Sequence, residues 1–181
     1  MKKLIPVAML LMLIGVVFSG CKESSSLLDV TFEADYQSDM DVVVSPSTLK
    51  IGVNGVFSSS TTIDPLSNSD LAKYANNIKS VEILEAKGTI LEVSSNATIL
   101  NADLSISAPD MDNAQWLFTN EPIEVGNVIE LTNANGQLDK LSSILNSKKT
   151  FTVAFIGETD EDNVTFTMRV YIRAKVTANP L

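Results

Sequence analysis

Apolar and polar side chains alternate with a period of two in several stretches of the chain, and this alternation is typical of half-buried β-strands. Apolar residues occupy every second position in the ranges 28–36 and 100–108, with polar residues between them. The same alternation runs through 151–155 and, over a greater length, through 164–176. These four ranges give the strongest strand predictions in the sequence.

Shorter apolar runs predict further strands, and polar or glycine-containing segments predict the turns between them. The shorter strands are predicted at residues 42–44, 50–57, 81–86, 89–93 and 128–131. Turns and loops are predicted at residues 37–41, at Asn54-Gly55, at the Ser/Thr-rich 58–69, at Lys87-Gly88 and at the acidic 157–163. We therefore expect Lys87-Gly88 to join two paired strands, and the acidic segment to join a long C-terminal hairpin.

Two stretches have apolar residues at helical spacing instead. In the first, Ser69 or Asp70 is the predicted cap of a short helix, with Leu71 and Ile78 on one face. The second is an amphipathic helix predicted at residues 137–146.

Many alternating strands, two short helices and no regular strand–helix alternation favour antiparallel sheets packed face to face. We predict a mainly β protein, an antiparallel β-sandwich of immunoglobulin-like size with two short helices. The 181-residue length is that of one domain. We expect this single domain to occupy residues 28–181.

The N-terminus has the pattern of an export signal rather than of a fold element. Lys2 and Lys3 precede an almost unbroken apolar run at residues 4–17, and small residues follow just before Cys21. The apolar run is shorter than the roughly 20 residues that a membrane span needs. A charged start, a short apolar centre and a small-residue cleavage site predict a secretory signal, and we expect residues 1–20 to be removed.

The residues before Cys21 resemble the lipobox of bacterial lipoproteins, in which the cysteine becomes the first mature residue and carries acyl chains such as palmitate. Ser19 and Gly20 fit this pattern, whereas Phe18 departs from the usual leucine. Residues 21–27 look like the short Ser-rich tethers of Bacteroidota-type lipoproteins. The resemblance implies lipidation at Cys21 and a lipid anchor in the outer membrane. It leaves open whether the domain faces the periplasm or the cell surface.

Charge and composition exclude several classes of partner and reaction. The net charge is −9, and removal of residues 1–20 takes two lysines and no acid, which brings it to −11. A field of this sign repels phosphate backbones, so we expect no nucleic-acid partner. The chain has no histidine and one cysteine, which excludes a Ser-His-Asp triad, a Cys-His pair and a cysteine-based zinc site. We expect no cofactor.

Candidate binding residues are few, and each has a structural alternative. Glu158, Asp160 and Asp162 form an acidic loop that offers oxygen ligands for Ca²⁺, although a solvated hairpin tip is the preferred interpretation. The acidic turns at 110–112 and 39–41 would add to a shared site if they lay at the same end of the sandwich. Trp116, the sole tryptophan, is either an exposed contact residue or a core residue, and its apolar neighbours favour the core.

Three functional hypotheses remain open. The first is a non-catalytic binding or accessory module, anchored to the membrane through its acyl chains and contacting a protein or glycan. The second is a structural subunit of a surface fibre or envelope complex, in which the apolar 42–44 would serve strand exchange. The third is a hydrolase that uses carboxylates alone, although no pair among the 22 acidic residues is singled out.

Overall fold

The computed structural model describes residues 28–47 and 54–179, most of which lie in β-strands. The strands are β1 (Val30–Val43), β2 (Ser45–Pro46), β3 (Gly55–Ile63), β4 (Ile78–Val93), β5 (Ala97–Ser107), β6 (Ala114–Ile123), β7 (Val128–Glu130), β8 (Phe151–Thr159) and β9 (Thr165–Ala178). The helices are α2 (Ser69–Lys73) and α3 (Gln137–Ser147), with short 3-10 turns at Pro65–Ser67 and Ala134–Gly136. The predicted signal and tether, residues 1–27, lie outside the described residues.

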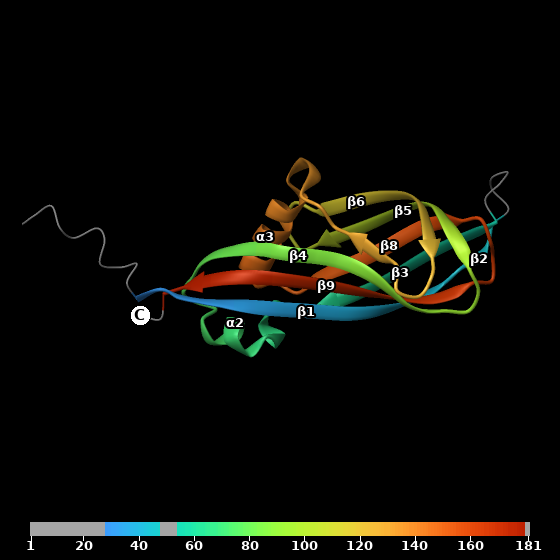
Figure 1. Cartoon of the computed structure of the whole chain (residues 1–181). Helices are drawn as coiled ribbons and strands as arrows, with labels where there is room; N and C mark the ends of the chain where they lie inside the picture. Colours follow the sequence, from blue (N-terminus) through green and yellow to red (C-terminus); the bar gives the residue numbers. More distant parts are fainter. Residues whose placement is uncertain (1–27, 48–53, 180–181) are drawn as a thin grey trace, which may run out of the picture.

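The strands form two antiparallel sheets that pack face to face (Figure 1). Sheet A has the order β1-β9-β4-β7, and sheet B has the order β2-β3-β8-β5-β6. The strands pair in a nested order, in which each pair lies between the two strands of the pair before it in the sequence: β1·β9, β3·β8, β4·β7 and β5·β6. Nested pairs wrapped into two sheets give the strand order of a jelly roll. The predicted antiparallel β-sandwich is therefore confirmed.

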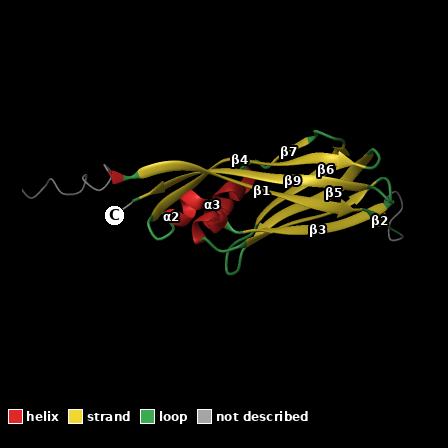
Figure 2. Ribbon diagram, turned by 90° about the horizontal axis from the view of Figure 1, so that it is seen from below, coloured by secondary structure: helices red, strands yellow, loops and turns green. Residues whose placement is uncertain are grey.

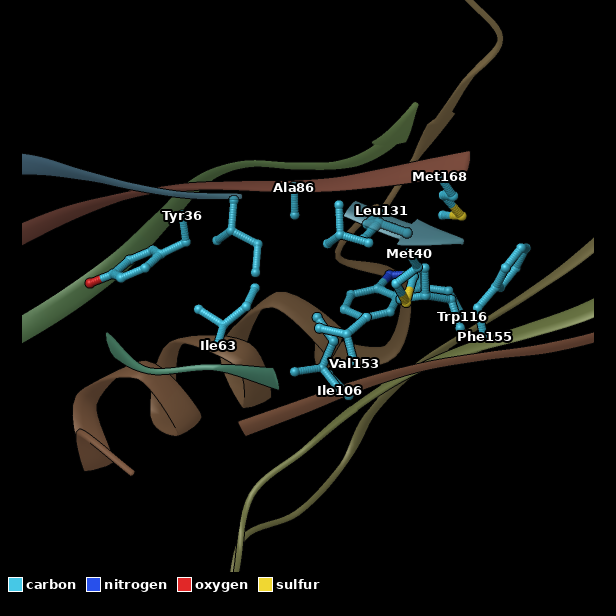
Figure 3. Packing of buried hydrophobic residues seen from close by; sticks show 14 of the residues in the cluster. Tyr36, Met40, Ile63, Ala86, Ile106, Trp116, Leu131, Val153, Phe155 and Met168 are labelled. Carbon is cyan, nitrogen blue, oxygen red and sulfur yellow. The ribbon is translucent and has the colours of Figure 1, made fainter. Parts of the chain in front are cut away.

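The core lies between the two sheets and is built from alternate side chains of every long strand (Figure 3). Three phenylalanines join the sheets: Phe57 and Phe155 from sheet B and Phe166 from sheet A. Their ring centroids lie 4.9, 5.7 and 6.5 Å apart. Aromatic side chains bury large apolar areas, so this cluster contributes strongly to the adhesion of the sheets.

The two helices cover the part of sheet A that extends beyond sheet B (Figure 2). Helix α3 packs on β4 through Leu141, Ile144 and Leu145, all fully buried, and the Ser142 hydroxyl donates to the carbonyl of Val81 at 2.5 Å. Helix α2 buries Leu71 beside β1. Neither helix in the described part of the chain is long and apolar enough to cross a membrane.

The prediction of a C-terminal hairpin is wrong. Strands β8 and β9 do not pair with each other, because β8 lies at the centre of sheet B and β9 lies inside sheet A. The acidic segment after Thr159 crosses from one sheet to the other. The alternation identified both strands correctly, but pairing partners depend on tertiary contacts that alternation does not encode.

Two predicted turns lie inside continuous strands. Strand β1 runs through residues 37–41, because inward-facing Ser38 is satisfied by a 2.7 Å hydrogen bond with the Thr61 hydroxyl. Strand β4 runs through Lys87-Gly88, where a Cβ on Gly88 would lie 2.1 Å from the Met168 methyl. The glycine is thus a close-approach residue and not a turn residue.

The segment between residues 54 and 78 also differs from its prediction. Gly55 pairs with Pro46 rather than forming a tight turn, and the Ser/Thr-rich stretch up to Ile63 is strand β3. Helix α2 is capped by Asn68, whose side chain accepts from the amides of residues 70 and 71. The helix ends at Lys73, so Ile78 begins β4 instead of extending the helix. The rest of the strand predicted at 50–57 falls partly outside the described residues.

Candidate functional site

The outer face of sheet B carries exposed aliphatic side chains around a carboxylate. Leu117 on β6 is 75% exposed and Ile156 on β8 is 53% exposed. Asp103 on β5 lies between them, because it pairs with Leu117 on one side and with Ile156 on the other. A large exposed aliphatic pair on an otherwise small and polar sheet face marks a candidate contact surface.

A hollow of about 450 Å³ lies over this row of side chains. We call it the face hollow. Its apolar lining comes from Leu117, Phe118, Ile156 and their neighbours, and its carboxylates are Asp103 and Glu158. A mainly apolar concavity with few polar groups is the usual form of a binding site.

Asp103 is the polar group of the face hollow whose hydrogen bonding is incomplete. Its Oδ2 accepts from the Gln115 side-chain amide. Its Oδ1 is buried and has no hydrogen-bond partner. Buried carboxylate oxygens are almost always paired, so Asp103 keeps an unsatisfied acceptor just beneath the surface of the hollow.

A second hollow, of about 510 Å³, lies along the edge of β6. We call it the edge hollow. It is bounded on one side by residues 115–118 and on the other by Glu130 and the segment 132–137. The backbone N–H of Gln115 donates to the side-chain oxygen of Gln137 at 2.9 Å across the hollow's lining. Leu117 and Phe118 line both hollows.

Trp116 forms the inner wall of the edge hollow. It is 6% exposed and lies within the cluster of core side chains in Figure 3. Its indole N–H donates to the carbonyl of Thr132 at 2.8 Å, which joins β6 to the segment after β7. The prediction that Trp116 is a core residue is confirmed.

The outer face of sheet A is a ladder of charged pairs that satisfy one another. Arg169 binds Asp39 through two hydrogen bonds of 2.7 and 2.8 Å, and Arg173 donates to Asp35 at 2.9 Å. The Tyr171 hydroxyl also donates to Asp35, at 2.7 Å. These hydrogen bonds hold the pKa of both aspartates below the usual value, and burial together with Asp35 raises the pKa of Tyr171. The hydrogen bonding of these groups is therefore satisfied within the sheet.

The predicted acidic site is not assembled in the described residues. The Asp160 carboxylate accepts from the Thr98 amide at 2.6 Å, which makes it a structural anchor for β5. No group of three or more metal-ligating side chains occurs in the described part of the chain. The turn at 110–112 follows the end of β5 that pairs with Thr152, whereas Asp160 lies at the opposite end of β8. Residues 39–41 lie within β1, so the three acidic segments do not share one end.

The apolar segment 42–44 lies at the end of β1, an edge strand of sheet A, and two of its three side chains are buried. Val42 and Val44 are buried in the core, and Val43 is the member that points outward, with 64% exposure. Residues 42 and 43 pair with β9, and the Ser59 hydroxyl donates to the carbonyl of Asp41 at 2.8 Å on the other side of the strand. Val43 is therefore the outward-facing residue of this segment, and the fibre-subunit hypothesis stays a prediction.

Of the residues that line the face hollow, the sequence analysis named Glu158, as part of the calcium candidate, and did not predict Asp103, Leu117 or Ile156 as contact residues. One signal was present: in residues 114–119 apolar side chains occupy both phases of the alternation, with Leu117 in the phase that should be polar. Ile156 breaks the polar phase of β8 in the same way. No pattern in the sequence places these two residues on either side of Asp103, because their adjacency depends on strand order.

Comparisons with known proteins add little. No family model matches the chain, and no curated protein matches it. Among solved structures it is similar to the decameric capsid protein of BFDV, with a TM-score of 0.40 and 12% identity over 82% of this chain and 99% of that chain. It is also similar to a chain of Desmodium yellow mottle tymovirus, with a TM-score of 0.31 and 14% identity over 84% of this chain and 90% of that chain. Likeness at this level carries no argument about function.

Proposed function

We propose that this chain is a lipid-anchored, non-catalytic binding module that contacts a protein or glycan outside the cytoplasm. The observation that carries the binding role is the face hollow, in which exposed Leu117 and Ile156 flank the carboxylate of Asp103. An apolar surface with carboxylates in its lining favours a ligand that brings an apolar face and a positive charge. The second part of the proposal, the anchor, depends on the lipobox-like residues that end at Cys21.

The position of the hollow supports an anchored role. Residues 21–27 lead into the start of β1, which lies beside Ala178 at one end of the sandwich (Figure 1). Val56 and Glu158, which line the face hollow, lie toward the opposite end. An acylated Cys21 would hold the first end at the membrane and present the hollow away from it. Each acyl CH₂ buried in lipid contributes about 0.8 kcal/mol, so two or three chains suffice for stable attachment.

The anchor is tested by replacing the cysteine. We expect Cys21→Ala to abolish incorporation of labelled palmitate in cells and to move the protein from the membrane fraction to the soluble fraction. Ser24→Ala in the same tether is the matched control and should change neither readout. Palmitate incorporation that survives Cys21→Ala would contradict lipidation at this residue.

Binding is tested with paired charge insertions on the two outer faces. The full chain, in mild detergent, is titrated against a panel of synthetic peptides and a panel of neutral and amino-sugar oligosaccharides. We expect at least one ligand to bind, and Leu117→Lys to weaken its affinity. Val43→Lys is the matched control, because it adds the same charge at an equally exposed aliphatic position on sheet A. If no ligand in either panel binds in a Leu117-dependent way, the proposed function is wrong.

A further inference from the structure

Strand β6 is an edge of sheet B with backbone groups that face outward. Among the described strands it pairs with β5 alone. The backbone N–H of Gln115 donates to the side-chain oxygen of Gln137. The backbone N–H of Gln115 therefore points away from β5. Because backbone direction alternates along a strand, the N–H and C=O groups of Leu117 and Thr119 face the same open edge. Asn120, with a φ of 58°, ends the regular stretch.

The two hollows lie on either side of this edge. The face hollow lies on the outer surface of sheet B, and the edge hollow lies between β6 and residues 130–137. A strand added beside β6 would point alternate side chains to the outer and inner sides of the sheet. Those side chains would meet Leu117 on one side and the edge hollow beside Trp116 on the other.

The charged side chains that line the two hollows have a single sign. The charged residues that line the two hollows are Asp103, Glu130 and Glu158, and neither lining includes a lysine or arginine. The chain from Cys21 onward carries a net charge of −11, so the surrounding field is also negative. Opposite charge on a partner would raise the association rate and favour it over acidic competitors.

We propose that an extended segment of another polypeptide, with lysine or arginine beside aliphatic residues, adds to β6 as the next strand of sheet B. This inference rests on the proposed binding function and names its ligand class. Hydrogen bonds to the backbone of Leu117 and Thr119 would provide affinity, as in other cases of strand addition. The apolar stem of a lysine or arginine would lie along Leu117 and place its charge near the Asp103 carboxylate.

Two other occupants fit this edge less well. A second copy of the chain would bring Asp103 and Glu130 against the same two carboxylates, which is an unfavourable pairing. A glycan would gain most from an exposed aromatic ring, but Trp116 is buried and the exposed side chains here are aliphatic. Open backbone groups, by contrast, are what an extended peptide requires.

The test uses the full chain in mild detergent and three end-blocked ten-residue peptides. The first alternates lysine and valine, the second replaces lysine with glutamate, and the third is the first with alternate backbone amides N-methylated. We expect the lysine–valine peptide to bind at least about tenfold more tightly than either of the others, because they lose the charge pairing or the backbone donors. Fluorescence of Trp116, the sole tryptophan, reports the binding.

Two matched pairs of variants locate the site. Leu117→Lys should weaken binding of the lysine–valine peptide about tenfold or more, and Val43→Lys should leave it within about twofold. Asp103→Asn should weaken binding more than Glu33→Gln, which removes an equal charge from sheet A. Hydrogen exchange at the Leu117 and Thr119 amides should slow at saturating peptide, a change that side-chain docking alone would not produce.

The outcomes separate this inference from the proposed function. Peptide binding without slower exchange at residues 117 and 119 would overturn strand addition. Leu117-dependent binding of oligosaccharides alone would also overturn it, while leaving the binding module intact. Concentration-dependent dimers that bury residues 117 and 119 would show that a second copy occupies the edge. Absence of any binding would remove the inference and the proposed function together.

Discussion

Single residues fix how closely neighbouring strands of one sheet pack, as at Gly88 of β4 and Met168 of β9 in sheet A. Gly88 in β4 has no room for a side chain, because the Met168 methyl occupies the space that its Cβ would take. Met168 is itself fully buried on the neighbouring β9. The glycine thus lets a large flexible side chain fill the core, and the two residues form one packing unit.

We expect Gly88→Ala to destabilise the protein by about 1–3 kcal/mol through overpacking. In the double variant with Met168→Leu, part of this loss should be recovered, since leucine has no atom in the position of the clashing methyl. Chemical denaturation of the two single variants and the double variant gives the coupling energy. Strictly additive effects would show that the contact with Met168 is not the cause.

The charged ladder of sheet A should contribute stability that depends on pH. The hydrogen bond from Arg169 lowers the pKa of Asp39 from its usual 3.8, so the folded state favours the ionised carboxylate. This contribution is fully present above the usual pKa and is lost as the pH falls through the lower folded value. We expect Asp39→Asn to lower Tm slightly at pH 7, and the difference from the parent chain to vanish as the pH falls well below 4. A difference unchanged at the lowest pH would rule out this linkage.

At the scale of elements, helix α3 covers a part of sheet A that the strands of sheet B do not reach. Sheet A is longer than sheet B, and α3 covers the inner face of β4 where sheet B ends (Figure 2). The helix was predicted at 137–146 from apolar spacing and is observed at Gln137–Ser147. Its role as a cover for exposed sheet was not predictable, because the unequal lengths of the sheets follow from strand pairing.

Loss of the buried side chains of α3 should lower the free energy of unfolding of the protein. Ile144→Ala should destabilise the protein by about 2–5 kcal/mol, because Ile144 is fully buried between α3 and the sheets. Asn146→Ala, at an exposed position on the same helix, should change stability by less than about 0.5 kcal/mol. Thermal denaturation followed by circular dichroism measures both variants. Equal effects would show that α3 does not support the core.

At the scale of the whole molecule, the first and the last described strands, β1 and β9, pair with each other. Strand β1 pairs with β9 along its whole length, from Val30 opposite Ala178 to Val43 opposite Thr165. The hydroxyls of Thr31 and Thr177 lie 3.5 Å apart across this pair. Contacts between residues this distant in sequence are costly in loop-closure entropy and are associated with slow folding.

A disulfide between the two ends tests this closure. In a Cys21→Ala background, Thr31→Cys with Thr177→Cys should oxidise readily and stabilise the protein by about 2–4 kcal/mol, because it closes a very long loop in the unfolded chain. Thr31→Cys with Thr167→Cys is the control, since residue 167 pairs with Asp41, ten positions along β1. Crosslinking in the control but not in the first variant would contradict the β1·β9 register.

The sequence by itself determined that the long alternating segments are strands, that residues 137–146 are helical, and that Trp116 enters the core. It did not predict strand β6 or the Ser/Thr-rich part of β3. Alternation of side chains is a local property, so it is readable at 28–36, 100–108 and 164–176 without knowledge of neighbours. Only the tertiary structure decided that β8 and β9 lie in different sheets, that Gly88 belongs to a continuous strand, and that Leu117 and Ile156 flank Asp103. The physical reason is that strand partners are chosen by burial and loop closure across the whole chain, whereas each strand's own pattern records only which of its faces is buried.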